Sequence, residues 1–321
     1  MVKKMARPIV FMFSGQGSQY YHMGKELFKN HAGFRQHMLE LDTLLFQYTG
    51  RSIVNEIYND HKSIADTFDT LFYTHPAIFI VEYALCRILL EMGIKPDYLL
   101  GSSLGEFTAA AISGIMPIED MLEFIVKQVA IFEAYCAPGN MIAILHNYAL
   151  YYAETSIHEY SELTSINYPS HFVVSVDKKK LAIIIEFLKE KNIIYQLLPV
   201  CYGFHSSLVE PAEKAFKHFV QTKSYQRPAI PFVSCLAGEK LTEVSNDFFW
   251  NIVRKPILFQ EAIQYLEKQH ECIYVDLGPS GTLANFLKHS HAGNFTGRCY
   301  PIMTPFKQEL RNVKTIESAL R

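Results

Sequence analysis

Ser103 lies at the centre of a Gly-Ser-Ser-Leu-Gly sequence that joins a short apolar run to a helical pattern. Residues 96–101 suit a buried strand, and residues 105–114 are rich in alanine and other small residues. At such a junction the flanking glycines allow close backbone approach, and a serine hydroxyl on the tight turn projects into a cleft. We predict that Ser103 is a nucleophile that becomes acylated. The alternative is a glycine-bounded turn whose serine only caps the helix.

His205 is the histidine, among 13 in the chain, that we choose as the general base for Ser103. It lies in residues 200–211, which leave a predicted strand and enter a predicted helix, and such loops often carry catalytic groups. The order of nucleophile before histidine is that of hydrolase-type serine enzymes. The alternative is an ordinary loop histidine without a catalytic role.

A second glycine-rich turn, Ser-Gly-Gln-Gly-Ser-Gln at residues 14–19, follows the first apolar run of the chain. It has neither the Lys-Ser/Thr pair of a phosphate-binding loop nor the third glycine of a dinucleotide-binding fingerprint. A glutamine in such a turn, here Gln16, can present its backbone N–H to a developing oxyanion. The alternative is a tight turn with a capping serine.

Composition favours a globular enzyme: the chain has 321 residues, of which 49% are hydrophobic and 19% charged. A net charge of −2 gives no electrostatic footprint for nucleic acid. The apolar run at residues 9–13 is too short for a signal sequence or a membrane span, so we expect a cytoplasmic protein that binds no membrane. The six cysteines form no CxxC pair, and we expect no metal and no cofactor.

The elements needed to position these residues fall into two predicted units. The larger unit, residues 1–138 and 200–321, is expected to be an α/β domain in which His75 opens a long apolar helix and has no catalytic role. The smaller unit, residues 139–199, is expected to be a ferredoxin-like α+β insert that forms one wall of a cleft over Ser103. Its expected elements are strands at 141–145, 165–167, 172–175 and 195–198 and a helix at 179–191.

Four motifs together resemble the malonyl-CoA:acyl-carrier-protein transacylase family. They are the Gly-Gln-Gly-Ser-Gln turn, Gly-Ser-Ser-Leu-Gly-Glu around Ser103, Phe-His-Ser around His205, and Asp-Leu-Gly-Pro at residues 276–279. Their order and spacing match the family over essentially the whole chain. The sequence is most similar to free-standing acyltransferase homologues of bacterial trans-acyltransferase polyketide clusters, the bacillaene cluster among them, and to their acyl-hydrolase relatives.

The resemblance implies a role for each matching residue. Ser103 matches the acylated serine, and His205 matches the base, which in this family is oriented mainly by a backbone carbonyl. Gln16 and Leu104 match the positions whose backbone N–H groups form the oxyanion hole. The implied fold is a large hydrolase-like α/β domain with a parallel sheet and an inserted ferredoxin-like subdomain. The implied partner is acyl carrier protein with its phosphopantetheine-linked acyl groups, and acyl-CoA is the alternative donor.

Two positions in the predicted acyl pocket depart from the family pattern. Ser102 stands where the family usually has a histidine, and Gln128 stands where it usually has an arginine that binds the malonyl carboxylate. A neutral amide lacks the two charge-assisted hydrogen bonds of an arginine, so malonyl is disfavoured as the acyl group. Lys127 lies about 100° around the helix from Gln128, so it cannot simply replace the arginine, and the direction of Arg87 stays open. Phe204 resembles the aromatic residue of malonyl-type enzymes and is expected to limit bulk near Ser103.

These observations leave three functions to weigh. The leading interpretation is an acyl-thioester enzyme of polyketide (antibiotic) biosynthesis that takes acyl groups from acyl carrier protein onto Ser103 and releases them to water. The second is a transacylase that moves malonyl or another acyl group from coenzyme A to carrier protein, since both reactions share one acyl-enzyme. The third is a catalytically silent docking protein in a synthase complex. A patatin-like lipase is disfavoured because the chain has no Asp-Gly-Gly or Asp-Gly-Ala segment.

Overall fold

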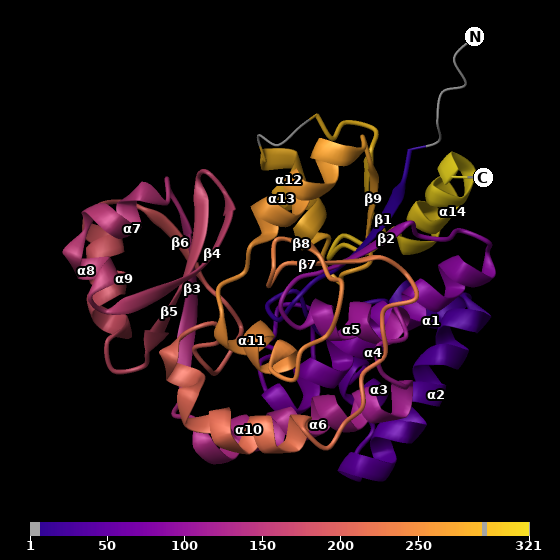
Figure 1. Cartoon of the computed structure of the whole chain (residues 1–321), viewed down its shortest axis with the longest axis horizontal. Coiled ribbons are helices and arrows are strands. Elements are labelled where there is room, and N and C mark those ends of the chain that lie inside the picture. The colour runs from indigo at the N-terminus through magenta and orange to yellow at the C-terminus, as the bar shows by residue number, and fades with distance from the viewer. Residues whose placement is uncertain (1–6, 291–293, 321) are drawn as a thin grey trace.

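A mostly parallel six-stranded sheet forms the centre of the larger part of the molecule (Figure 1). The computed structural model describes residues 7–290 and 294–320. The strands of this sheet are β1 (Ile9–Phe13), β2 (Tyr98–Gly101), β7 (Phe232–Ser234), β8 (Glu239–Lys240), β9 (Ile273–Asp276) and β10 (Cys299–Pro301). Their order is β10-β9-β1-β2-β7-β8, and all neighbours are parallel except β8, which pairs antiparallel with β7 at the edge.

Strand β1 shows why this sheet is covered on both faces. Successive side chains of a strand point to opposite faces. Phe11 and Phe13 belong to one buried apolar cluster, whereas Val10 and Met12 belong to another. A parallel strand buried on both sides needs a continuous apolar sequence, which is what the sequence has at residues 9–13.

Helices supply the apolar residues that cover the two faces. On the Phe11 side lie α1 (Lys25–Asn30), α2 (Ala32–Thr49), α3 (Ile53–Ile57), α4 (Leu71–Glu91), α5 (Gly105–Ile112), α6 (Ile118–Tyr135), the 3-10 helix η1 (Ser207–Ala212), α10 (Glu213–Val220), α11 (Phe248–Arg254) and α14 (Glu309–Leu320). On the Val10 side lie α12 (Phe259–Gln269) and α13 (Thr282–His289). Helix α4 begins about one turn before the expected start at His75, so Pro76 lies inside the helix, in its second turn, where it has no N–H to donate to the carbonyl of Phe72.

Helix α4 is the one helix of the described part of the chain that is long and apolar enough to span a membrane. Within the protein, 78% of its most apolar 18-residue stretch is buried. Its buried residues include Ile78, Phe79 and Leu85, which all belong to the main apolar cluster. Helix α4 is therefore packed as a core helix of this fold.

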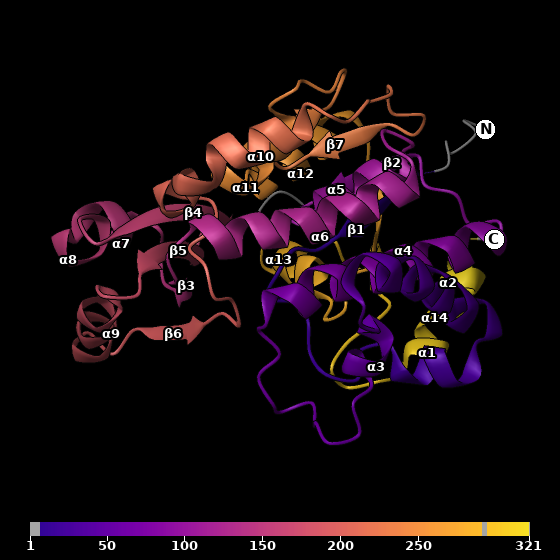
Figure 2. The ribbon, with the colours of Figure 1, turned by 90° about the horizontal axis from the view of Figure 1, so that it is seen from below.

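A separate four-stranded antiparallel sheet lies to one side of the larger sheet in both views (Figures 1 and 2). Its elements follow the chain order strand, helices, two strands, helix, strand: β3 (Gly139–Leu145), α7 (Ala149–Ala153), α8 (Thr155–His158), β4 (Ser161–Tyr168), β5 (His171–Asp177), α9 (Leu181–Glu190) and β6 (Ile194–Leu197). The strand order β4-β5-β3-β6 is that of a ferredoxin-like unit. The predicted fold class is confirmed, and the unit boundaries at 138/139 and 199/200 stay a prediction.

The two faces of the small sheet have different partners. Ile142 and Ile144 of β3 pack with Ile184 of α9 in the core of the small unit. Met141 and Ala143, on the opposite face of the same strand, belong to the main apolar cluster. The small sheet therefore turns one face toward the large unit, and this face forms a wall of the cavity described below.

Candidate active site

The turn that carries Ser103 joins β2 to α5 and depends on two glycines. Ser103 has a φ of 55°, a left-handed conformation that is costly for a residue with a side chain. A methyl group on Gly101 would overlap the backbone of Glu106, and one on Gly105 would overlap the carbonyl of Phe13. The two glycines of the Gly-Ser-Ser-Leu-Gly sequence thus allow the turn to pack closely against β1 and the start of α5.

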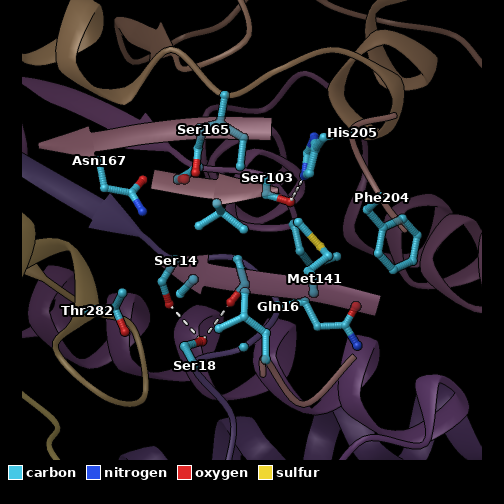
Figure 3. A pocket seen from close by; sticks show the side chains of 18 of the residues that line it. Ser14, Gln16, Ser18, Ser103, Met141, Ser165, Asn167, Phe204, His205 and Thr282 are labelled. Atoms are coloured by element: carbon cyan, nitrogen blue, oxygen red, sulfur yellow. Dashed lines mark hydrogen bonds between the residues drawn. The ribbon is translucent and has the colours of Figure 1, made fainter. Parts of the chain in front are cut away.

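Ser103 and His205, 102 positions apart in the chain, are hydrogen-bonded to each other. The distance from Ser103 Oγ to His205 Nε2 is 2.7 Å (Figure 3). On the other side of the ring, His205 Nδ1 lies 2.9 Å from the carbonyl oxygen of Lys255. A carbonyl only accepts, so Nδ1 carries the proton and Nε2 is free to accept the proton of Ser103.

Burial keeps the imidazole of His205 neutral. Only 3% of the residue is exposed, and burial lowers the pKa of His205 to about 4, while the backbone hydrogen bond to Lys255 opposes this shift. His205 also has a positive φ, 60°, and its backbone N–H donates to the carbonyl of Val253 at 2.8 Å. The backbone of His205 is thus strained, its ring is held by hydrogen bonds, and its Nε2 is unprotonated at neutral pH.

Two buried carboxyl groups brace the Ser103 turn. Glu82 of α4 accepts hydrogen bonds from the backbone and hydroxyl of Ser14 and from the hydroxyl of Thr108 on α5. Glu106, in the first turn of α5, accepts from the hydroxyl of Ser234 and from the backbone N–H of Leu236. Burial raises the pKa of both Glu82 and Glu106 to about 8. These contacts tie the ends of β1 and β7 to the helix that follows Ser103.

The loop with Gln16 lies directly against Ser103. A methyl group on Gly15 would come within 2.7 Å of Ser103 Cβ and 2.9 Å of the Ser102 carbonyl oxygen. Leu104 follows Ser103 and is the N-cap residue of α5, where backbone N–H groups have no partner within the helix. The structure thus places both Gln16 and Leu104 beside Ser103, and their oxyanion role stays a prediction.

A cavity of about 370 Å³ lies between the Ser103 turn and the small sheet. In Figure 3, Ser103 and His205 point toward each other at one side of it, and Gln16, Met141 and Phe204 lie around the same space. Its described lining includes all seven residues predicted for the site, but no Asp, Glu, Lys or Arg. The seven are Gln16, Ser102, Ser103, Leu104, Gln128, Phe204 and His205.

Gln128 lies at one end of a hydrogen-bonded chain of neutral side chains. It is fully buried on α6, and its Nε2 donates to His75 Nδ1 at 3.4 Å. His75 Nε2 is 2.8 Å from Gln16 Oε1, and Gln16 Nε2 donates to the hydroxyl of Thr74 at 2.8 Å. Burial lowers the pKa of His75 to about 3, so this ring is neutral as well.

His75 is the residue that the sequence interpretation placed wrongly. It was expected only to open a helix, but it lies inside α4, is 3% exposed and lines the cavity. A polar residue in an apolar helix needs a hydrogen-bond partner when it is buried, which is the signal that marks it. The partners themselves, on α6 and on the Gln16 loop, are far away in the chain.

No cation takes the place of the family's arginine in the described part of the cavity. Lys127 is exposed to solvent. The Arg87 side chain is 43% exposed and lies 3.9 Å from Glu91, and neither Lys127 nor Arg87 lines the cavity. Among the described residues, no three His, Cys, Asp or Glu side chains gather as metal ligands.

Phe204 forms part of the cavity wall next to the polar group. It is 5% exposed, and its ring lies 5.7 Å from His75 and 5.2 Å from Phe132, between ring centroids. Its effect on acyl size stays a prediction.

Sequence reasoning missed the polar residues of the small sheet that line the same cavity, Ser165, Asn167, His171 and Gln196. Strand periodicity places them on one face but does not say what that face meets.

Comparisons with known proteins agree with this geometry. The family model described as an acyl transferase domain matches residues 10–318. The chain belongs to this acyl transferase family. It is 54% identical to the polyketide biosynthesis acyltransferase homologue PksD of Bacillus subtilis, over 98% of this chain and 97% of PksD. It is 48% identical to the homologue BaeD of Bacillus velezensis, with 98% of each chain covered.

A solved structure shares the fold of this chain. The malonyl CoA-acyl carrier protein transacylase of Coxiella burnetii superposes with a TM-score of 0.82 and 21% identity, over 98% of each chain. At this identity the similarity speaks for the fold alone. The match to the family model and the similarity to PksD confirm the family resemblance noted in the sequence.

Proposed function

We propose that this acyl transferase family member acts in polyketide biosynthesis as an acyl-thioester hydrolase. It would take acyl groups from the phosphopantetheine arm of acyl carrier protein and release them to water. The observation that carries the proposal is the intact Ser103–His205 hydrogen bond beside a cavity whose described lining has no charged side chain. The similarity to PksD and BaeD supports the polyketide setting.

In the acylation step, His205 Nε2 takes the proton from Ser103 Oγ as the oxygen attacks the thioester carbonyl. The resulting oxyanion receives hydrogen bonds from the backbone N–H groups of Gln16 and Leu104. The C–S bond then breaks, and His205 returns the proton to the departing sulfur, which leaves the carrier arm as a free thiol. The acyl group is now an ester on Ser103.

In the second step, His205 Nε2 takes a proton from water as the water oxygen attacks the ester carbonyl. The C–O bond to Ser103 breaks, and the proton passes from His205 to Ser103 Oγ. A free carboxylic acid leaves, and the hydroxyl of Ser103 is restored. The carbonyl of Lys255 stabilises the charged imidazole in both steps because it accepts the Nδ1 proton.

The uncharged cavity favours neutral acyl groups over malonyl. A malonyl carboxylate beside Gln128 would lose its hydration without gaining a countercharge. An unpaired buried charge of this kind costs a few kcal/mol, roughly a hundredfold in affinity.

Release of free acid from loaded carriers tests this function. Purified protein is incubated with acetyl-loaded and malonyl-loaded acyl carrier protein, and acetate and malonate are measured over many turnovers. We expect sustained release of acetate and much slower release of malonate. Faster release of malonate would refute the specificity, and no release of either acid would refute the hydrolase.

Transfer to a second acceptor is the alternative function, and the family name and the name of PksD favour it. Adding an unloaded carrier, or coenzyme A, to the same reaction separates the two. A hydrolase keeps producing free acid, whereas a transferase moves the acyl group to the added thiol. The retained Ser103–His205 contact argues against a catalytically silent docking protein.

A further inference from the structure

The oxygen of the Gln128 side chain has no hydrogen-bond partner among the described residues. Gln128 is fully buried, lines the cavity and uses its nitrogen to donate to His75. Its Oε1 is one of four buried side-chain oxygen or nitrogen atoms in the described part of the chain that lack a partner. Of the four residues concerned, Gln128 is the one that lines this cavity.

In the structure, the hydrogen bonds from Thr74 to Gln128 form one continuous chain that leaves the oxygen of the Gln128 amide unpaired. Gln16 Nε2 donates to the hydroxyl of Thr74, and Gln16 Oε1 lies 2.8 Å from His75 Nε2. This oxygen only accepts, which places the proton of the neutral His75 ring on Nε2 and leaves Nδ1 as an acceptor. Gln128 offers its nitrogen to Nδ1, and its oxygen has no partner among the described residues.

The unpaired amide oxygen makes the cavity wall at Gln128 a hydrogen-bond acceptor. Phe107 and Phe204 line the same cavity, and in such apolar surroundings an unsatisfied acceptor is costly. Ser102 also lines it, but a hydroxyl can donate or accept and imposes no polarity. A group that carries an O–H or N–H would satisfy the oxygen, whereas a carboxylate would place two acceptors together.

We propose that Gln128 determines acyl specificity by accepting a hydrogen bond from a donor group on the acyl chain. The substrates favoured by this site are hydroxyacyl or aminoacyl groups, rather than unsubstituted chains of the same length. This inference rests on the proposed function, because it concerns the acyl group that Ser103 receives. A site built around a hydrogen bond to substrate rejects the analogue that lacks the polar group more strongly than an apolar pocket rejects a size change.

Carriers loaded with matched four-carbon chains test the proposal. Butyryl, 2-hydroxybutyryl and 3-hydroxybutyryl carriers are compared by kcat/KM for release of free acid by the wild-type protein. We expect at least one hydroxyacyl carrier to exceed butyryl by about 10- to 100-fold. Equal values for all three, or a preference for butyryl, would overturn the proposal and leave the hydrolase function standing.

Two variants locate the preference at Gln128. Gln128→Met keeps the size but removes the acceptor, and we expect it to lose the hydroxyacyl preference while it still releases butyrate. Gln196→Met makes the same change at an exposed glutamine of the cavity lining and is expected to keep the preference. A preference that persists in Gln128→Met would overturn the assignment to Gln128. Gln128→Leu serves as the second variant if the methionine protein does not fold.

The same assay separates failure of this proposal from failure of the proposed function. If no carrier releases its acyl group and no acyl-enzyme forms on Ser103, the function itself is wrong. If acyl groups are released without regard to a hydroxyl, only the role of Gln128 is wrong.

Discussion

The reaction end and the acyl end of the cavity are built in different ways. At the reaction end, Ser103 and His205 are held by their own backbones, both at positive φ, and by the carbonyl of Lys255. At the acyl end, Gln128 and His75 depend on side-chain hydrogen bonds between separate helices. Under the proposed function, the chemistry is tied to local turns, whereas acyl recognition rests on a few neutral side chains. A family built like this can retain its reaction while its acyl pocket changes.

Removing the nucleophile breaks the reaction end completely and has the largest expected effect. Ser103→Ala deletes the group that forms the acyl ester, so we expect release of acid to fall by about a thousandfold or more. Ser102→Ala, at the adjacent serine of the same turn, is the matched control and should still form an acyl-enzyme. Acid release and intact-protein mass report both variants, and an adduct on Ser103→Ala would disprove the assignment.

The next largest effect is expected on the stability of the Ser103 turn. Its glycines are sterically required, so a larger residue should lower the free energy of unfolding. In Gly105→Ala the added methyl group overlaps the Phe13 carbonyl, and we expect a loss of unfolding free energy of about 3 kcal/mol or more. Gly50→Ala is the control: Gly50 has a φ of 66°, but a methyl group there would meet no atom within 4 Å beyond its neighbours in the chain, so the cost is about 1 kcal/mol of backbone strain. Denaturant unfolding compares them, and equal losses would show that the close approach at Gly105 is unimportant.

A substitution at Gln128 should change which acyl group loads Ser103, while Ser103 and His205 stay able to react. Gln128→Arg introduces a cation able to form two charge-assisted hydrogen bonds with a carboxylate. We expect the ratio of malonyl to acetyl loading of Ser103 to rise by about 10- to 100-fold. Lys127→Arg, at the exposed neighbour, should leave the ratio unchanged. Loading is read by intact-protein mass, and an unchanged ratio in Gln128→Arg would show that Gln128 does not face the acyl group.

The smallest expected effect is the dependence of kcat/KM on pH, which reports the protonation of His205. Burial lowers the pKa of His205 to about 4, and only the neutral ring can take the serine proton. Activity should therefore be present above this pKa and be lost as the pH falls through about 4. We expect kcat/KM to stay within about twofold between pH 5.5 and 8 for a neutral acyl carrier. A midpoint near 6.5, the usual pKa of histidine, would contradict the buried environment of this base.

Sequence reasoning was most successful where structure is determined by neighbouring residues. The strand at residues 9–13 and the Ser103 turn follow from apolar runs and glycines, and the ferredoxin-like unit follows from alternating strand and helix patterns. The edge strands β8 and β10 have two and three residues, too few to show a periodic pattern. The partners of His75 depend on how α4, α6 and the Gln16 loop pack together, which no local pattern specifies.

The lifetime of the acyl group on Ser103 tests the central claim most directly. Wild-type protein is mixed with acetyl-loaded carrier, and intact-protein mass and free acetate are followed in time, with and without a second, unloaded carrier. We predict an acetyl adduct on Ser103 that decays into acetate at the same rate in both cases. Transfer of the acetyl group to the second carrier in place of acetate, or preferential accumulation of a malonyl adduct from malonyl carrier, would contradict this account.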